Sequence, residues 1–445
     1  MKPDNLQALY QDHHSEICRR TEKALQKTNH DTLIIYSGMQ EYFFLDDNHI
    51  PFKVNPHFKA WLPISDAPES FVIFEPGTKP VLVLFKPIDY WFKITPFESD
   101  FWTGYFDVRV LDTVAAVYEQ LPAKDRIAFI GPGPERFKDK LNADFNPTEL
   151  ISRLDYARAC KTDYEVACIR ESSRLAVDGH IAAERAFREG ATEFDIHLAY
   201  LRASQQTEEQ LPYGNIIALN ENAAVLHYHH MSNDLPDQVH SFLIDAGATY
   251  NGYASDITRT YSSTQNEFQE LINAMDAAQQ AICDDVKPGV DYKDLHISAN
   301  QRIAQLLTDF NLVNLSAEAI VETGISTSFF PHGLGHYLGL QVHDVGGFQA
   351  SEEGGVIPRP DGHPYLRLTR KLEVGHVITI EPGLYFIEPL LAALSKSEHA
   401  KHIDWNKVDS FRCYGGIRVE DDVVVTASGH ENITRPLFNG GLVTA

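Results

Sequence analysis

Hydrophobic positions in the first 160 residues switch between helical spacing and short unbroken apolar runs. Helical spacing indicates an amphipathic helix, whereas short apolar runs bounded by Gly or Pro are typical of buried strands. The predicted elements are a helix over 5–28, a strand over 32–38, a hairpin over 71–85 that turns at Pro76-Gly77, a strand over 126–131 and a short helix in PERFKDKL. We expect a mixed α/β domain over residues 1–160, in which no cluster of catalytic residue types stands out.

A second domain is expected over residues 161–445. From Thr162, the segment TDYEVACIRESSRLAVDGHIAAERAF predicts a long amphipathic helix, and helices then alternate with antiparallel strands. The fold class predicted for the whole chain is therefore α/β (α+β).

Two segments of the second domain resemble each other. REGATEFDIH (188–197) and KPGVDYKDLH (287–296) both place Asp five residues after Gly, followed by an aliphatic residue and His. Each predicts a helix that ends at Gly and a newly capped helix after it. Two interpretations stay open: the common chemistry of helix–turn–helix segments, or an internally duplicated domain.

A hairpin is predicted in FLIDAGATYNGYASDITRTY (242–261), because Asn251-Gly252 favours a two-residue turn. The opposite pairs in that register are Tyr250 with Tyr253, Asp245 with Thr258, and Asp256 with Gly247. Asp245 and Asp256 then share one face, with Cβ atoms roughly 7–8 Å apart. Two carboxylates that lean toward each other across this gap repel unless a cation lies between them.

Two further acids interrupt apolar runs. Glu381 lies in VITIEPGLYF, and Glu420 lies in GGIRVEDDVVV with Arg418 two residues away on the same face. A solvated acid on an edge strand explains any one such position, but four in one half of the chain favour a common site.

Three histidines lie in FFPHGLGHYLGLQVHD (329–344), namely His332, His336 and His343. The HxxxH spacing would indicate zinc on a helix, but the glycines and proline of this segment make a helix unfavourable. A Gly-rich loop can instead bring an imidazole close to a small site.

The charge balance narrows the class of partner. Lys and Arg total 38 against 62 for Asp and Glu, a net charge of −24, which disfavours nucleic acid or an anionic membrane as the main partner. No apolar run approaches the roughly 18 residues of a membrane span, and the N-terminus has no apolar signal-peptide region. The five cysteines are scattered, as in a protein of the reducing cytosol. We expect a soluble cytoplasmic protein.

Four carboxylates and one imidazole make an oxygen-rich ligand set, which favours Mn²⁺ or a similar ion. Four negative ligands balance two divalent cations. Two such ions about 3.5–4 Å apart can share a hydroxide at neutral pH, so the sequence predicts a hydrolytic site.

The segments DAGATYNGYASDITRTY, PHGLGHYLGLQVHD, TIEPGLYF and GGIRVEDDVVV resemble the metal motifs of the pita-bread metallopeptidases, among them methionine aminopeptidase, aminopeptidase P, creatinase and prolidase. The five ligand positions of that family are all filled, by Asp245, Asp256, His336, Glu381 and Glu420. The chain is most similar to bacterial prolidases (Xaa-Pro dipeptidases), including the organophosphorus acid anhydrolases. That likeness includes FLDDNHIPFKVNPHFKAWLP, RACKTDYEVACIRE and LPYGNIIALNENAAVLHYHH.

The resemblance implies a C-terminal pita-bread domain, internally pseudo-duplicated, with an antiparallel sheet flanked by helices. It also implies two Mn²⁺ per subunit (with Co²⁺ or another divalent ion as alternatives), hydrolysis of Xaa-Pro dipeptides by a metal-bound hydroxide, a homodimer, and a side activity on organophosphorus triesters.

The resemblance also implies roles for individual residues. Asp256 and Glu420 take the bridging positions, Glu381 shuttles the proton of the attacking water, and His332 and His343 steady the oxyanion or the substrate. The expected substrate contacts are Arg370 for the C-terminal carboxylate, with His227, Tyr213 and Tyr292 lining the pocket. Arg418 is expected to act as a partner of Glu420.

Two alternative functions were weighed. An aminopeptidase P would cleave longer peptides before proline, and a non-catalytic pita-bread binding module would have lost metal ligands. The filled ligand positions and the acidic charge disfavour the second alternative.

Overall fold

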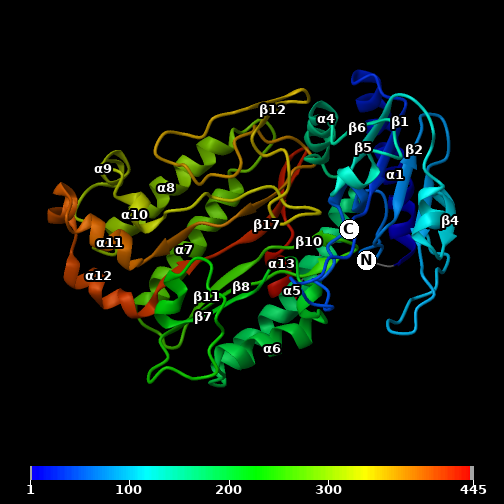
Figure 1. Cartoon of the computed structure of the whole chain (residues 1–445). Coiled ribbons are helices and arrows are strands. Elements are labelled where there is room, and N and C mark those ends of the chain that lie inside the picture. The colour runs from blue at the N-terminus through cyan, green and yellow to red at the C-terminus, as the bar shows by residue number, and fades with distance from the viewer. Residues whose placement is uncertain (1–2, 441–445) are drawn as a thin grey trace. The chain divides into compact units, whose positions relative to one another are not determined.

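The structure, a computed structural model, describes residues 3–440, which divide into two compact units. Unit 1 holds the residues up to 158 together with 162–167 and 351–354, and unit 2 holds the remainder. Figure 1 shows helices and sheets in both units, so the chain is of the mixed α/β class, as predicted.

Unit 1 is built on one mixed sheet in the order β4-β3-β2-β1-β5-β6. Its strands are β1 (Thr32–Tyr36), β2 (Phe71–Phe74), β3 (Val81–Phe85), β4 (Asp107–Leu111), β5 (Ile127–Ile130) and β6 (Ala143–Phe145), and its helices are α1 (Pro3–Lys27), α2 (Pro56–Lys59), α3 (Val114–Tyr118) and α4 (Thr148–Arg158). The central strand β1 pairs antiparallel with β2 and parallel with β5, and it is buried along its whole length. This burial explains the unbroken apolar run in the sequence.

The helix predicted in PERFKDKL is shorter than expected. The segment forms only a 3₁₀ turn, Pro134–Phe137, after Gly133 at φ 55°. Only Phe137 and Leu141 reach the core of unit 1, so a single turn is enough to bury the apolar side chains of the segment.

Unit 2 contains the remaining elements, of which α5, β12 and β13 also include residues of unit 1. Its helices are α5 (Asp163–Arg188), α6 (Glu193–Ser204), α7 (Glu267–Asp284), α8 (Tyr292–Asp309), α9 (Ala317–Glu322), α10 (Ser326–Phe329), α11 (Glu388–Leu394), α12 (Trp405–Phe411) and α13 (Arg435–Phe438). Its strands are β7 (Ile216–Leu219), β8 (Ser241–Asp245), β9 (Thr249–Tyr250), β10 (Tyr253–Ala254), β11 (Thr258–Ser262), β12 (Gln349–Ser351), β13 (Gly354–Val356), β14 (Val377–Ile380), β15 (Gly383–Tyr385), β16 (Gly416–Arg418), β17 (Asp421–Thr426) and β18 (Gly429–Asn432).

The order of elements in unit 2 is repeated. Helices α5 and α6 precede the antiparallel sheet β11-β8-β7, and helices α7 and α8 precede the antiparallel sheet β14-β17-β18. Both helix pairs turn at a glycine with positive φ, Gly190 at 83° and Gly289 at 87°, and both second helices are capped, by Thr192 and Asp291. The predicted Gly stops and helix caps are therefore confirmed.

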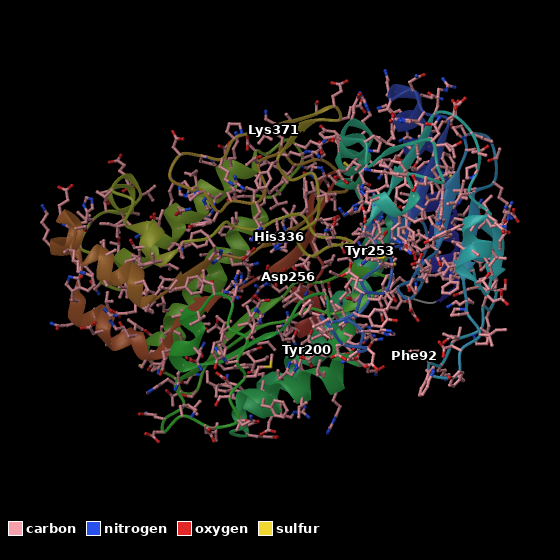
Figure 2. The ribbon with its side chains drawn as sticks, viewed as in Figure 1. Phe92, Tyr200, Tyr253, Asp256, His336 and Lys371 are labelled. Carbon is pink, nitrogen blue, oxygen red and sulfur yellow. The ribbon has the colours of Figure 1, made fainter. Side chains whose placement is uncertain are left out.

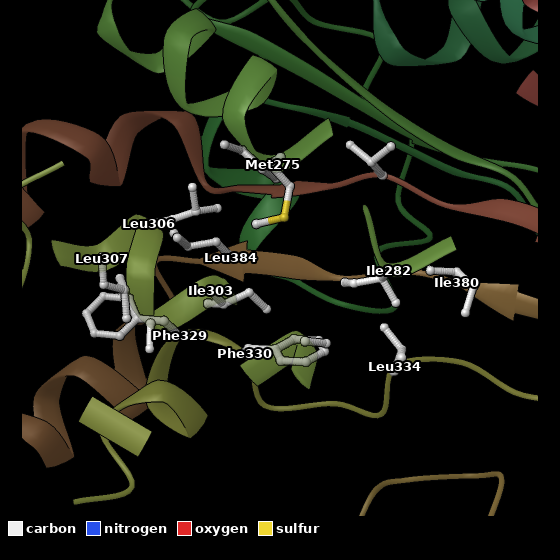
Figure 3. Packing of buried hydrophobic residues seen from close by; sticks show 14 of the residues in the cluster. Met275, Ile282, Ile303, Leu306, Leu307, Phe329, Phe330, Leu334, Ile380 and Leu384 are labelled. Atoms are coloured by element: carbon white, nitrogen blue, oxygen red, sulfur yellow. The ribbon is translucent and has the colours of Figure 1, made fainter. Parts of the chain in front are cut away.

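An isolated bridge between Thr258 in β11 and Glu420, directly before β17, links the two three-stranded sheets of unit 2. The largest core cluster of the unit gathers α7, α8 and the strands around β14 and β15, and Figure 3 shows Met275, Ile303, Ile380 and Leu384 within it. This packed layer fixes the strand ends at which the acidic residues lie.

Within residues 3–440, no helix has the length and apolar character needed to cross a membrane.

Candidate metal centre

The hairpin between β8 and β11 has the predicted register. Tyr250 pairs with Tyr253, and Asp245 pairs with Thr258. The turn residues Asn251 and Gly252 both have positive φ, 50° and 87°, as a type I′ turn requires. The same register continues between the β8–β11 pair and the β9–β10 pair, where Ala246 N–H donates to the Ile257 carbonyl at 3.0 Å.

The hydroxyl of Tyr213 joins the two aspartates of this hairpin. It lies 2.8 Å from Asp245 Oδ1 and 2.6 Å from Asp256 Oδ1. One hydroxyl proton cannot satisfy both contacts, so the second oxygen needs a proton or a cation of its own. Tyr213 was expected to line the substrate pocket, and the structure places its hydroxyl at the carboxylates.

His336 enters the same cluster from the Gly-rich loop, which is not helical, as predicted. Its Nδ1–H donates to the Tyr337 carbonyl at 3.0 Å, and its Nε2 lies 3.3 Å from Asp256 Oδ2 and 3.6 Å from Glu381 Oε1. Figure 2 shows His336 next to Asp256. A Cβ on Gly335 would lie 2.2 Å from the Thr379 carbonyl oxygen, so only glycine lets this loop approach β14 so closely.

Glu381 and Glu420 lie where strands break. Glu381 follows β14 and precedes Pro382, and Glu420 lies between β16 and β17. Glu420 Oε2 accepts a hydrogen bond from the Thr258 hydroxyl at 2.7 Å. Ligand atoms of Asp256, His336 and Glu420 all lie within 4.8 Å of one another.

Crowding of negative charge shifts the acids of the cluster. Burial and the neighbouring Asp256 raise the pKa of Glu381 to about 7, against the opposing effect of His336. Burial and the other carboxylates also raise the pKa of Glu420 and Asp256 above the ordinary range. Burial lowers the pKa of His336, but the hydrogen bond to Asp256 and the charge of Glu381 raise it overall. All four pKa values are raised, so each group favours its protonated form, which indicates an excess of negative charge in the site.

A polar chain supports the cluster from one side. The Arg418 guanidinium donates to Asp245 Oδ2 at 2.7 Å and to the Tyr385 hydroxyl at 2.8 Å. The Tyr385 hydroxyl lies 2.9 Å from His332 Nε2, and His332 Nδ1 lies 2.8 Å from the Gly333 carbonyl. His332 is therefore the acceptor at Nε2 and the donor at Nδ1.

The other predicted histidines lie near the same centre. The ring of His343 lies 4.4 Å from that of His336 and nearly perpendicular to it. Burial lowers the pKa of both His332 and His343 to about 3, and the charge of His227 contributes in each case. His227 is itself exposed.

The remaining predicted substrate residues are buried. Tyr292 is inaccessible to solvent and donates to the Thr379 carbonyl at 2.9 Å. Arg370 is 2% exposed, and its guanidinium contacts Glu373 at 2.8 Å.

The donor set of the main cluster fits divalent metal ions, because carboxylate oxygens and an imidazole nitrogen converge with raised carboxyl pKa values that a cation would offset. A second group, Cys160, Glu373 and His376, fits a cation less well. Glu373 N–H donates to His376 Nδ1 at 3.1 Å, so the neutral ring carries its proton on Nε2, the nitrogen that would have to bind. Burial and the charges of Arg370 and Lys161 lower the pKa of His376 to about 2, which shows a positive local potential.

Sequence reasoning missed two side chains of the centre. Tyr385 shares a strand face with the position of Glu381 at period two, and that alternation was the available signal. Thr258 was identified as the partner of Asp245 in the register but was given no role, because its contact with Glu420 joins two distant sheets.

The comparisons identify the family. Residues 167–427 match the model of Metallopeptidase family M24, and residues 8–156 match the Xaa-Pro dipeptidase N-terminal domain. The chain belongs to Metallopeptidase family M24. Among M24 relatives, it is 48% identical over 436 residues to an Xaa-Pro dipeptidase of Pseudoalteromonas translucida, covering 98% of this chain and 99% of that one. It is 49% identical over 440 residues to an Xaa-Pro dipeptidase of Xanthomonas campestris pv. campestris, with 98% and 99% covered. The prolidase family resemblance is thus confirmed.

Solved structures of two aminopeptidases share the fold. The aminopeptidase PepP of Pseudomonas aeruginosa superposes with a TM-score of 0.73 at 23% identity, with 95% of both chains covered. Proline aminopeptidase P II from Yersinia pestis gives a TM-score of 0.71 at 24% identity, with 95% and 96% covered. The pita-bread fold predicted for the chain is confirmed.

Proposed function

We propose that the protein is an Xaa-Pro dipeptidase that uses two divalent metal ions, Mn²⁺ in the first instance. The observation that carries the proposal is the convergence of acids and an imidazole from the end of β8, the segment between β10 and β11, the Gly-rich loop and two strand breaks onto one cluster. The names of full-length relatives at 48% and 49% identity support the dipeptidase activity.

The proposed ligands are Asp245, Asp256, His336, Glu381 and Glu420, with Asp256 and Glu420 in the bridging positions. When bound, two such ions lower the pKa of a water molecule and polarise the peptide carbonyl. Tyr213, Thr258 and Arg418 orient the carboxylates through the contacts given above.

Glu381 is the proposed acceptor of the proton from the attacking water. Its Oε1 lies 3.6 Å from His336 Nε2, which places the carboxylate inside the ligand cluster, where a general base would have to lie. His343 is neutral at pH 7 and can donate one ring N–H to the developing oxyanion. His332 reaches the substrate by exchanging its bond to Gly333 or to Tyr385.

Arg370 is the proposed partner of the free C-terminal carboxylate of the substrate. To bind this carboxylate, the Arg370 guanidinium would release the carboxylate of Glu373, which is half-exposed. His227 is the further proposed pocket residue, whereas Tyr213 contacts the two aspartates and Tyr292 is inaccessible to solvent. An Xaa-Pro bond lacks the N–H that many peptidases bind, which is why such dipeptides need a dedicated site.

The decisive experiment compares Ala-Pro with Ala-Pro-Ala, using the chelated protein with and without added Mn²⁺. We expect Mn²⁺-dependent hydrolysis of Ala-Pro. Efficient cleavage of the tripeptide alone would instead identify an aminopeptidase P, and an activity indifferent to chelation would refute the metal-dependent mechanism.

A homodimer is proposed on the strength of an exposed apolar surface in unit 1. Five of its side chains are at least 77% exposed, namely Phe44, Leu45, Ile88, Tyr90 and Trp91. The ring of His49 stacks on the ring of Phe92 (labelled in Figure 2), with ring centroids 4.9 Å apart. This contact joins the loop that carries Phe44 and Leu45 to the loop that carries Ile88, Tyr90 and Trp91. Apolar surface of this kind on a folded protein indicates a protein partner, and sedimentation will measure the oligomeric state.

Three further proposals follow from the sequence, the first two from its composition and pattern and the third from the family resemblance. They are a cytoplasmic location, a domain boundary between residues 160 and 161, and hydrolysis of organophosphorus triesters. The last is tested with paraoxon under the conditions that support Ala-Pro cleavage.

A further inference from the structure

The carboxylate of Glu193, in the first turn of α6, is buried among four hydrogen-bond donors. Glu193 is 1% exposed. Its donors are Leu219 N–H at 2.8 Å and Asn222 Nδ2 at 2.9 Å on Oε1, with the Tyr228 hydroxyl at 2.8 Å and Ser232 N–H at 2.8 Å on Oε2. In the part of the chain that the structure describes, residues 3–440, Glu193 makes no salt bridge.

A buried carboxylate without a cationic partner is costly unless its oxygens are fully hydrogen-bonded, and bonds to an ionised acceptor are the strong class. All four donors of Glu193 belong to one continuous segment, residues 219–232. The carboxylate therefore binds the beginning, middle and end of this segment to the first turn of α6.

Capping of α6 does not explain this arrangement. Thr192 already caps the helix by accepting the Asp195 N–H at 3.1 Å. Favourable interaction of an acid with the helix dipole needs no burial and no set of four donors. The hydrogen bonds of Glu193 instead hold residues 219–232 against α6.

The held segment contains His227, the residue next to Tyr228. Tyr228 is 7% exposed, whereas His227 is exposed, and His227 contributes to the lowered pKa of His332 and of His343. The bond between the Tyr228 hydroxyl and Glu193 fixes the backbone immediately beside His227.

We infer that Glu193 is a positioning residue for the reaction, whose buried carboxylate holds residues 219–232 so that His227 faces the substrate end of the metal centre. This inference rests on the proposed function, because it deepens the role of His227 in binding the dipeptide. Glu193 touches neither substrate nor metal, and it acts only through the segment.

The test is a double-mutant cycle between Tyr228→Phe and His227→Ala, with Ala-Pro as substrate and Mn²⁺ bound. Tyr228→Phe deletes one of the four donors with little change of shape. We expect a rise in KM and a fall in kcat/KM of about threefold to tenfold, the range for one hydrogen bond, with kcat nearly unchanged. In the His227→Ala background, the same substitution should produce no further loss, because coupled residues are not additive.

Asp195→Asn is the matched control, since it neutralises another acid in the first turn of α6, whose carboxylate accepts a hydrogen bond from the Thr192 hydroxyl. Its kinetics should equal those of the wild type. Glu193→Gln places an amide N–H₂ against donors and should show the larger effect if it folds. An additive cycle, or an unchanged KM in Tyr228→Phe, would overturn the inference.

A second readout separates this inference from the proposed function. Hydrogen exchange of residues 219–232 should accelerate in Tyr228→Phe relative to both the wild type and Asp195→Asn, without any substrate. If the wild type fails to cleave Ala-Pro, the proposed function fails, and the exchange result alone then tests whether Glu193 holds residues 219–232. Unchanged exchange in Tyr228→Phe would refute that Glu193 holds this segment.

Discussion

Removal of metal should make the stability of the protein fall as the pH rises. In the metal-free chain the pKa of Glu381 is about 7, against an ordinary value of 4.5, because of burial and the neighbouring Asp256. A carboxyl with a raised folded-state pKa contributes stability below its unfolded pKa, and it loses that contribution as the pH rises through the folded pKa. The window of loss therefore runs from about 4.5 to about 7.

The magnitude follows from the size of the shift. At about 1.4 kcal/mol for each pKa unit, Glu381 alone accounts for about 3 kcal/mol, of which about 2.5 kcal/mol is lost between pH 5 and pH 8. The raised pKa values of Asp256 and Glu420 act in the same direction. Bound cations reverse the effect, since they require the ionised carboxylates.

The assay is urea unfolding of the chelated protein and of the Mn²⁺-loaded protein at pH 5 and pH 8. Glu381→Gln removes one titrating carboxyl together with its repulsion of Glu420, and both changes reduce the loss of stability with rising pH. We expect the chelated wild type to lose about 2.5 kcal/mol more than chelated Glu381→Gln over this range. Equal losses in the two chelated proteins would refute the account of the crowded carboxylates.

Three substitutions test other parts of the centre. Thr258→Val removes the donor to Glu420 and should weaken Mn²⁺ binding about 10-fold to 100-fold in calorimetric titration; unchanged affinity would show that this hydroxyl does not orient the ligand. Tyr385→Phe breaks the link between Arg418 and His332 and should lower kcat about threefold to tenfold at unchanged metal content, whereas loss of metal would make its role structural. Arg370→Met should lower kcat/KM for Ala-Pro about 10-fold to 100-fold, as for a lost charged hydrogen bond, and should leave Ala-Pro-amide unaffected; equal losses on both substrates would exclude recognition of the carboxylate.

Local signals in the sequence were sufficient for the first half of the site. Asn251-Gly252 sets the turn, and the period of two then determines which residues lie opposite Asp245. The helix stops at Gly190 and Gly289 are equally local, because each depends on a positive φ that glycine adopts without strain.

Long-range contacts were beyond these signals. The approach of His336 to β14 depends on the missing Cβ of Gly335, and the bond between Thr258 and Glu420 depends on how two sheets meet. Spacing along the chain carries no information on either contact. The placement of Tyr213 at the aspartates, rather than on a pocket wall, was likewise fixed only by packing.

The central claim is that the five side chains hold two divalent ions on which hydrolysis depends. Stepwise addition of Mn²⁺ to the chelated protein, with bound metal and Ala-Pro hydrolysis measured on the same samples, tests it most directly. The account predicts saturation at two ions per chain and activity that rises with occupancy, both lost in His336→Ala. Full activity with no bound metal, or a His336→Ala variant that binds Mn²⁺ like the wild type, would contradict it.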